Sequence, residues 1–311
     1  MAKLTVIGAG NVGATVADCV ARKDIVNEVV LIDIVEGLPQ GKALDMQESA
    51  PVHGFDTRVT GTNAYENTAG SDICVITAGR PRTADMSRDD LLELNANIVR
   101  SVTERFAADS PDAIIIVVSN PLDAMTSVAH AASGFPAQRV MGMAGILDTA
   151  RYRTFIALEL GVSVRDVQAL LLGGHGDSMV PLPSCTTVGG IPLPGLLPPE
   201  KIHAIVERTK GGGGEISRLM GASAWYAPGA SAAAMVESVM KNLSRVLPCA
   251  VQPSGQYGLA DLFIGLPARL GRNGVEDILE VGLSDEEQAL LDASAEHVRR
   301  NLDVLRQKGF M

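Results

Sequence analysis

Apolar and polar positions along the first half of the chain follow two repeats, one typical of buried strands and one typical of amphipathic helices. Residues 3–7 predict a strand, residues 12–22 a helix and residues 28–32 a second strand. Further elements are predicted as strands at residues 72–77, 113–118 and 139–143 and as a long helix at residues 88–109. This alternation predicts an α/β fold of the Rossmann type, a doubly wound parallel sheet with helices on both faces.

The second half of the chain has a mixed pattern that predicts an α+β unit. Its expected elements are a helix at residues 147–160, a strand at 167–172, a turn and edge strand at 189–193, helices at 199–210, 215–225 and 230–243, and a hairpin at 272–274. Ser284 to Glu287 form a capping box that predicts the start of a last helix. We place the domain boundary near Met143, which gives units of residues 1–143 and 144–311.

Four consecutive glycines, Gly211 to Gly214, interrupt the helical pattern of the second half. Glycine weakens helices, so we expect a flexible joint between two helices there. The alternative is a hinge that lets a helix beside a substrate move.

The first predicted strand leads directly into a glycine-rich motif. The motif reads Gly8-Ala9-Gly10-Asn11-Val12-Gly13. In dinucleotide-binding folds the first glycine permits a tight turn, the second lets a pyrophosphate approach the backbone, and the third lets the helix pack against the strand. The start of the helix offers free N–H groups to phosphates. The context of strand, glycines and helix therefore predicts a dinucleotide site.

Asp33 ends the second predicted strand, twenty residues after Gly13. Its carboxylate is suited to accept hydrogen bonds from the ribose hydroxyls of an adenosine and would repel a 2′-phosphate, so we expect NAD rather than NADP. The alternative is an acid that only caps a turn at the strand end.

The composition narrows the class of protein further. The 311 residues include 46% hydrophobic ones, enough for one large domain or two moderate ones. The net charge of −10 argues against nucleic acids and anionic membranes as partners. Any anionic substrate must therefore be attracted by a local cluster of basic residues.

Cysteine usage and hydropathy indicate a cytoplasmic location. Cys19, Cys74, Cys185 and Cys249 form no C-x-x-C pair, which is typical of reduced thiols, and we expect no metal site. The apolar run at residues 113–118 is too short to span a bilayer, and the strand expected at residue 3 leaves no room for a targeting peptide.

His175 lies in the segment Gly174-His175-Gly176-Asp177, where small neighbours expose the imidazole. Asp148, near the start of a long helix, is a candidate partner that would fix the tautomer and favour the protonated ring. Arg151 follows three residues later on the same helical face, where the two side chains could also form a simple surface ion pair.

Two strand ends carry further candidates. The segment from Arg80 to Arg88 holds three arginines, which form either a solvated loop or a lid that brings guanidinium groups onto a carboxylate. Asn120 ends a strand before Pro121, and its amide either bonds a substrate or nicotinamide or forms a turn.

Together these residues resemble the NAD-dependent malate dehydrogenases, in the branch most similar to lactate dehydrogenases. The resemblance extends from Lys3 nearly to the C-terminus. The motifs that carry it are the glycine motif with Asp33, Arg80-Pro81-Arg82 with Met86-Ser87-Arg88, Val118-Ser119-Asn120-Pro121, Ile146-Leu147-Asp148-Thr149-Ala150-Arg151 and Gly174-His175-Gly176-Asp177-Ser178.

The resemblance implies a role for each of these residues in the reversible oxidation of malate to oxaloacetate. His175 would exchange the proton on the C2 oxygen, Asp148 would orient it, and Arg151 would bind the C1 carboxylate. Arg88 would polarise the carbonyl and Arg82 would bind the second carboxylate, where lactate enzymes have glutamine. Further implied contacts are made to substrate by Asn120 and to cofactor by Ala78, Gly79, Asn95, Val118 and Asn120.

The sequence departs from the family pattern at Gly211 to Gly214 and at Ala84-Asp85, where malate enzymes commonly have Pro-Gly. Two other functions are compatible with the fold: a dehydrogenase for lactate or a branched acid, and an NAD-binding sensor without catalysis. Arg82 argues against the first and the His–Asp–Arg set against the second.

The helix at residues 230–243 carries small apolar residues that suit either core packing or a subunit interface. The resemblance favours the interface, because members of the family form dimers and tetramers. We therefore expect a homo-oligomer, with a tetramer favoured.

Overall fold

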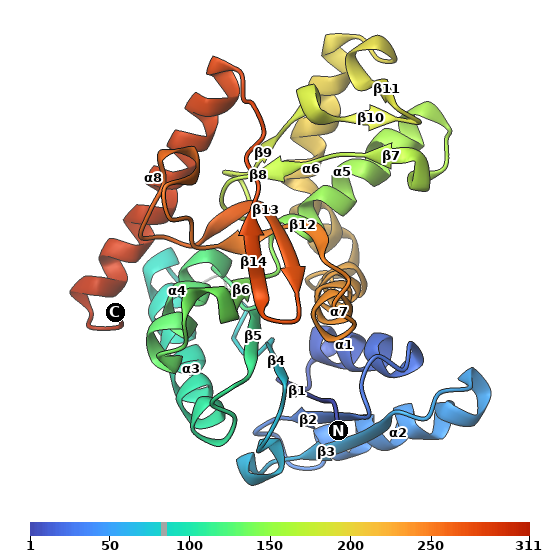
Figure 1. The fold of residues 1–311 in the computed structure, drawn as a ribbon, viewed down its shortest axis with the longest axis vertical. Coiled ribbons are helices and arrows are strands. Elements are labelled where there is room, and N and C mark those ends of the chain that lie inside the picture. The colour runs from blue at the N-terminus through green and yellow to red at the C-terminus, as the bar shows by residue number, and fades with distance from the viewer. Residues whose placement is uncertain (82–85) are drawn as a thin grey trace.

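The computed structural model describes residues 1–81 and 86–311, apart from the side chain of Arg88. A single large sheet runs through the centre of the chain (Figure 1). Six of its strands come from the first half of the sequence and pair in parallel: β1 (Lys3–Ile7), β2 (Glu28–Ile32), β3 (Arg58–Thr62), β4 (Ile73–Ile76), β5 (Ile114–Val117) and β6 (Val140–Gly142).

Three further strands come from the second half and extend the same sheet in antiparallel fashion. They are β12 (Arg245–Val251), β13 (Ile264–Gly271) and β14 (Gly274–Ile278). The full order is β14-β13-β12-β6-β5-β4-β1-β2-β3, and β12 joins β6 through the pair Ala250 and Gly142. The sequence pattern did not predict this continuity, because β6 and β12 lie about a hundred residues apart.

Helices cover both faces of this sheet (Figure 1). Their bounds are α1 (Asn11–Arg22), α2 (Leu38–His53), α3 (Arg88–Asp109), α4 (Leu122–Ser133), α5 (Gly145–Leu160), α6 (Pro199–Met220), α7 (Tyr226–Met240) and α8 (Asp285–Gln307). Strands β4 and β5 are buried at every position, as expected for parallel strands that helices cover on both sides. The predicted α/β class and its parallel NAD-binding sheet are therefore confirmed.

Two helix starts have the side-chain hydrogen bonds that stabilise them. At α8 the predicted capping box is present, because Ser284 accepts from the Glu287 N–H and Glu287 accepts from the Ser284 N–H. Ser87 and Asp90 form a second such box at the start of α3. Replacing an N-cap side chain of this kind by alanine typically costs ~1 kcal/mol of stability.

Smaller sheets lie beside α5 and α6, built from β7 (Val167–Gln168), β8 (Leu171–Leu172), β9 (Val180–Pro181), β10 (Thr187–Val188) and β11 (Ile191–Pro192). The prediction of one strand over residues 167–172 was wrong. In the structure β7 pairs with β10 whereas β8 pairs with β9, so the segment changes partner in its middle. Hydrophobic periodicity alone does not report such a change.

The prediction of a flexible joint at Gly211 to Gly214 was also wrong. Helix α6 runs through all four glycines without a break and ends at Met220, and the following Gly221 adopts a left-handed φ of 67°. The buried positions of α6 recur at helical spacing as Ile202, Ile205, Thr209 and Gly212. Packing of this face against α5 therefore outweighs the weak helix propensity of glycine, a cost of about 1 kcal/mol per residue.

Helix α7 packs against α1 of the same chain. The two approach so closely that a Cβ on Gly229 would lie 2.6 Å from Thr15 Cβ. The small apolar residues of α7, such as Ala232 and Val236, are buried in the core of this chain. This face therefore gives no support to a subunit interface.

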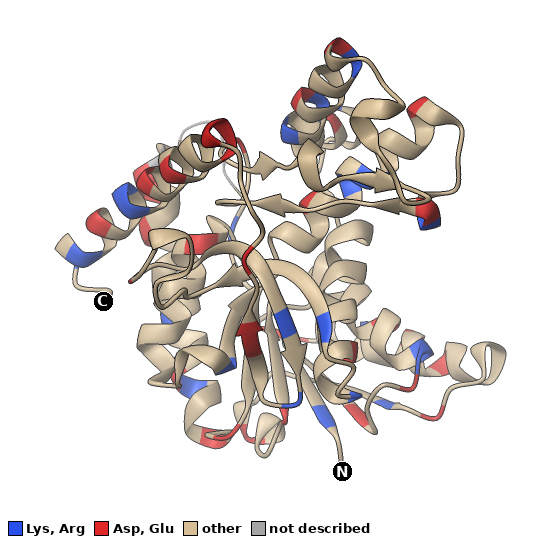
Figure 2. Cartoon of the chain, turned by 45° about the horizontal axis from the view of Figure 1, so that its top comes forward, with Lys and Arg blue, Asp and Glu red and all other residues tan. Residues whose placement is uncertain are grey.

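Charged residues are distributed over the helices, and Figure 2 shows acidic and basic positions mixed along α8. Within the described residues, the helices contain no segment that is long and apolar enough to cross a membrane.

The glycine run in α6 gives a stability prediction. A Cβ on Gly211 would enter open space, so we expect Gly211→Ala to raise the free energy of unfolding by about 0.5–1 kcal/mol, because alanine loses less backbone entropy in a helix. The matched control is Gly212→Ala, whose Cβ would lie 3.2 Å from Arg151 Cδ and should gain less. The measurement is the midpoint of urea unfolding, and equal gains in both variants would contradict this packing argument.

Candidate active site

The glycine motif forms a tight turn between β1 and α1. Gly8 has a φ of 104°, and a Cβ there would lie 2.7 Å from Thr77 Oγ1. A Cβ on Gly13 would lie 1.9 Å from the carbonyl oxygen of Gly8, so helix and strand touch at this point. Gly10 instead faces open space. The first turn of α1 contains no acidic residue, which leaves its positive dipole end available to a phosphate.

Asp33 follows β2 and braces this turn. Its Oδ2 accepts a hydrogen bond from the Ala9 N–H at 2.6 Å, and its Oδ1 accepts one from the Val35 N–H at 3.0 Å. On the other side of the motif, Lys42 of α2 donates to the Ala9 carbonyl at 2.8 Å. The loop is therefore held from both β2 and α2.

A cavity of about 550 Å³ opens beside Asp33. Its polar floor comes from the glycine motif, Asp33 and the ends of β1, β2 and β4, including Gly8, Gly10, Ala78 and Gly79. Its far wall is an apolar stripe of α3 formed by Leu94, Ile98 and Val102. These three side chains are only half-buried, and they line the cavity. The cavity has the polarity and size expected for the adenosine part of a dinucleotide.

Asn95 of α3 fastens two loops at the carboxyl edge of the sheet. Its amide accepts from the Arg80 N–H at 2.8 Å and donates to the carbonyl oxygens of Arg80 at 3.1 Å and of Asn120 at 2.7 Å. The side chain is 1% exposed. Asn95 thus positions the strand ends that carry Gly79, Val118 and Asn120.

A second cavity of about 460 Å³ continues from these strand ends toward the second half of the chain. The predicted residues that line it are Val12, Gly79, Asn95, Val118, Asn120, Arg151 and His175. Asn120 precedes Pro121 through a cis peptide bond. The structure therefore brings candidates from both halves of the chain to one site.

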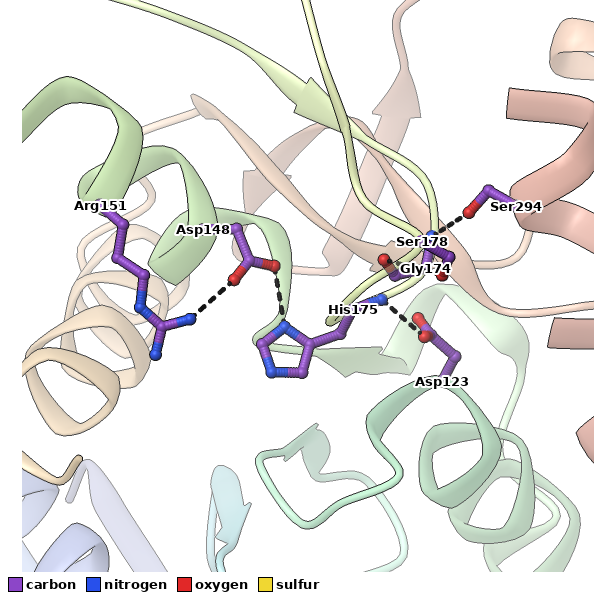
Figure 3. Close-up of polar contacts among 7 residues, drawn as sticks. All are labelled: Asp123, Asp148, Arg151, Gly174, His175, Ser178 and Ser294. Atoms are coloured by element: carbon purple, nitrogen blue, oxygen red, sulfur yellow. Dashed lines mark hydrogen bonds and ion pairs between the residues drawn. The ribbon is translucent and has the colours of Figure 1, made fainter. Parts of the chain in front are cut away.

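At the centre of this site, a buried carboxylate joins His175 to Arg151 (Figure 3). Asp148 Oδ2 lies 2.8 Å from His175 Nδ1, and Asp148 Oδ1 lies 3.3 Å from Arg151 Nη1. The Asp148 side chain is 2% exposed, and Arg151 Nε is buried without a hydrogen-bond partner among the described residues. Figure 3 shows the second ring nitrogen of His175 turned away from the carboxylates.

The two carboxylates near His175 govern its charge. Burial lowers the pKa of His175, but the charge and hydrogen bond of Asp148, together with the charge of Asp123, raise it above its usual value overall. His175 is therefore suited to hold a proton near neutral pH and to release it in the reverse reaction.

The loop that carries His175 is anchored by residues that sequence reasoning missed. The His175 N–H donates to Asp123 Oδ2 at 2.9 Å, and the Gly174 N–H donates to Ser294 Oγ at 2.8 Å. Asp123 lies in the first turn of α4 and Ser294 in the middle of α8. The available signal was a carboxylate two residues after Pro121, between the apolar residues Leu122 and Ala124.

The glycine run of α6 lines the same cavity beside Arg151. A Cβ on Gly212 would lie 3.2 Å from Arg151 Cδ, and one on Gly213 would lie 3.7 Å from Arg151 Nη2. Two further cations line the cavity: Arg80, which belongs to the predicted arginine segment, and Lys210, which was not predicted. The glycines thus leave room for the Arg151 side chain.

The predictions for Arg82 and for the lid departure at Ala84-Asp85 fall outside the described residues. Arg88 is the first residue of α3, and its backbone is described but its side chain is not. Within the described residues, the structure contains no group of three or more His, Cys, Asp or Glu side chains that could hold a metal ion.

A parallel sheet with a glycine turn, an acid after β2 and a histidine–carboxylate pair at the carboxyl edge defines an NAD-binding oxidoreductase. The chain belongs to the lactate/malate dehydrogenase family. Residues 2–142 match the family's NAD-binding domain, and residues 146–308 match its alpha/beta C-terminal domain.

Individual relatives cover nearly the whole chain. A malate dehydrogenase of Salinibacter ruber is 66% identical over 305 residues, which are 98% of this chain and 97% of that protein. One of Thermomicrobium roseum is 59% identical and covers 98% of each chain. The 1.55 Å structure of a Salinibacter ruber malate dehydrogenase aligns with a TM-score of 0.95 at 64% identity, covering 99% of both chains.

A lactate dehydrogenase structure is also similar. The enzyme of Cryptosporidium parvum, complexed with lactic acid and NAD, aligns with a TM-score of 0.94 at 42% identity and covers 98% of both chains. Fold similarity alone therefore does not separate the two substrates.

Proposed function

We propose that the chain catalyses the NAD-dependent interconversion of (S)-malate and oxaloacetate. The observation that carries this proposal is the buried Asp148, which contacts both His175 and Arg151 in a cavity that continues from the glycine motif. The relatives described above, which carry the name malate dehydrogenase, support the choice of substrate.

The residues fit the cofactor. Gly8 and Gly13 pack the turn tightly against its neighbours, whereas Gly10 faces open space in which a pyrophosphate would fit. Asp33 would accept hydrogen bonds from the adenosine ribose. The remaining proposed cofactor contacts are Ala9, Asn11, Val12, Ala78, Gly79, Asn95, Val118 and Asn120. When bound, the reduced cofactor NADH would supply a hydride to C2 of oxaloacetate, and the oxidised cofactor NAD would accept one from C2 of malate.

The side chains of the chain supply proton transfer and charge. His175, protonated and fixed through Nδ1 by Asp148, gives its other proton to the C2 oxygen as oxaloacetate becomes malate. Arg151 binds the C1 carboxylate with the N–H groups that Asp148 does not occupy. Arg88 would stabilise the developing alkoxide, and Arg82 would pair with the distal carboxylate.

We infer that the protein acts as a homo-oligomer, with a tetramer favoured. Helix α2 exposes Leu44 at 61% and Val52 at 83%, and the junction of α6 and α7 exposes Leu219 at 80% and Tyr226 at 72%. If these side chains form contiguous apolar patches, they would suit a subunit interface. Light scattering should give a multiple of 32.5 kDa, and a monomer mass at micromolar concentration would contradict this inference.

The proposed location is the cytoplasm. All four cysteines are free in the structure, and Cys74 and Cys249 are fully buried. Free thiols are typical of a reducing compartment.

The role of His175 is tested by His175→Asn. We expect oxaloacetate reduction to fall about 100- to 10,000-fold, because the acid that protonates the C2 oxygen is lost. NADH binding, measured by fluorescence titration, should stay close to wild type, since His175 lies in the second cavity and not beside Asp33. Near-normal turnover in the variant would exclude His175 as the proton donor.

The choice of substrate is tested at Arg82. In wild type we expect kcat/KM for oxaloacetate to exceed that for pyruvate by roughly 100- to 10,000-fold, because pyruvate leaves the Arg82 charge without a partner. Arg82→Gln should reverse much of this preference. The measurement is kcat/KM for both substrates in both proteins. If the oxaloacetate-to-pyruvate ratio of kcat/KM differs by less than about threefold between the two proteins, Arg82 does not bind the distal carboxylate.

A further inference from the structure

The loop that carries His175 contacts two carboxylates, and only Asp148 has a part in the proposed mechanism. Figure 3 shows Asp148 on one side of His175 and Asp123 on the other. Asp148 contacts the ring, whereas Asp123 Oδ2 accepts the backbone N–H of His175 at 2.9 Å. His175 is therefore held by α5 at its ring nitrogen and by α4 at its backbone N–H.

There is little freedom in the loop at this point. A Cβ on Gly174 would lie 2.9 Å from Val298 Cγ2, 3.0 Å from Ser178 Oγ and 3.2 Å from Asp123 Oδ2. Ser294 of α8 adds a third anchor through the Gly174 N–H. The position of His175 thus depends on contacts from α4, α5 and α8.

A buried carboxylate such as that of Asp123 is an unusual acceptor for a single backbone N–H. It is 8% exposed, and its Oδ1 is buried without a hydrogen-bond partner among the described residues. A neutral acceptor would hold the His175 N–H equally well without the cost of burying a charge, because a half-satisfied buried carboxylate is unfavourable. A buried charge that packing does not require indicates an electrostatic role.

We propose that Asp123 is a positioning residue for the acid–base step, which anchors the His175 backbone and whose negative charge helps keep the imidazole protonated. This inference rests on the proposed function. It adds a second carboxylate to the one that touches the ring, and it explains why the anchor is an acid.

The titration of Asp123 agrees with this role. Burial is the main cause that raises the pKa of Asp123 to about 6; the charge of Asp148 also raises it, whereas the His175 N–H and the His175 charge lower it. Above about pH 6 the carboxylate is therefore charged and supports the imidazolium. Because this pKa is raised on folding, the charged form lowers the free energy of unfolding above pH 6, and that loss disappears as the pH falls below the unfolded value.

Other charged groups surround this position and enter its pH dependence. They lie on α3, α5, α6, α8 and the loop itself, and comprise Asp89, Asp148, Arg151, Lys210, His297, Arg300 and Asp177. A variant must therefore change the charge of Asp123 and leave these groups in place.

The test compares Asp123→Asn with Ser294→Ala. Asparagine keeps an oxygen that can accept the His175 N–H but removes the charge, so we expect the pKa of His175 to fall by roughly 0.5 to 1 unit. The alkaline limb of kcat/KM for oxaloacetate and the acidic limb for malate should both move to lower pH by that amount. Ser294→Ala loosens the same loop without a change in charge, so it should lower the rates and leave both limbs where they are.

A second readout does not depend on the substrate. NMR titration of the His175 imidazole, assigned by the signal that His175→Asn removes, should show the same downward shift in Asp123→Asn. Asp123→Glu keeps the charge and should retain a His175 pKa near that of wild type, even if its rates are lower. We also expect Asp123→Asn to raise the Tm at pH 7.5, because it removes a buried charge.

The outcomes separate the two proposals. Wild type that is active on oxaloacetate, with the same His175 pKa in Asp123→Asn, would overturn the role of Asp123 and leave the proposed function intact. A lower Tm together with an unshifted His175 pKa would identify Asp123 as a structural residue only. Wild type that does not reduce oxaloacetate would overturn the proposed function, even where the NMR shift is observed.

Discussion

The site depends on one buried carboxylate. Asp148 is 2% exposed and contacts His175 at 2.8 Å and Arg151 at 3.3 Å. A carboxylate buried without partners would be strongly unfavourable, so the two cationic side chains and the acid stabilise one another. Asp148 also lies in the first turn of α5, where the helix dipole favours a negative charge. Proton transfer and carboxylate binding are therefore aligned by the same side chain.

The sheet connects this acid to the rest of the molecule through backbone hydrogen bonds. Helix α5 starts just after β6, and β6 pairs with β12, which in turn pairs with β13. Gly265 of β13 exchanges two backbone hydrogen bonds with Gly173, at 2.9 and 3.1 Å, directly before the loop that carries His175. A Cβ on Gly265 would lie 2.4 Å from the Gly173 carbonyl oxygen, and Gly173 adopts a left-handed φ of 84°, so each position favours glycine for its own reason. The Asp148 and His175 backbones are thus fixed by one continuous sheet that crosses both halves of the chain.

Much of this arrangement could be predicted from the sequence where local signals agree. The bounds of β1 and α3 follow the hydrophobic pattern to the residue, and the capping box at Ser284 was recognised from side-chain type and spacing. The prediction at the glycine run fails because helix propensity is a weak local preference. The burial of Gly212 beside Arg151 is a tertiary contact that the local sequence does not report.

The site was harder to predict than the fold. The pairing of His175 with Asp148 joins residues 27 positions apart, and residue types alone left it as one option among several. The resemblance to a family supplied that pair, but it supplied neither Asp123 nor Ser294, which lie 52 and 120 positions from their partners in the loop. Contacts of such long range depend on how α4 and α8 pack, and no local pattern encodes them.

Electrostatics in the site must meet two opposed requirements. A dianionic substrate needs uncompensated positive charge, and the chain as a whole carries −10. The imidazolium of His175 needs negative charge nearby, yet each added carboxylate also repels the substrate.

The geometry separates these requirements in space, because Figure 3 shows Asp123 on the side of His175 that faces away from Arg151. Negative charge at that place can support the proton on His175 while the free N–H groups of Arg151 remain open to a carboxylate. The acid that touches Arg151 is Asp148, which contacts Nη1, while Nη2 lies beside Gly213 of the glycine run that lines the cavity. The distribution of two acids around one histidine thus allows a basic binding surface and a protonated acid catalyst to exist within the same small cavity.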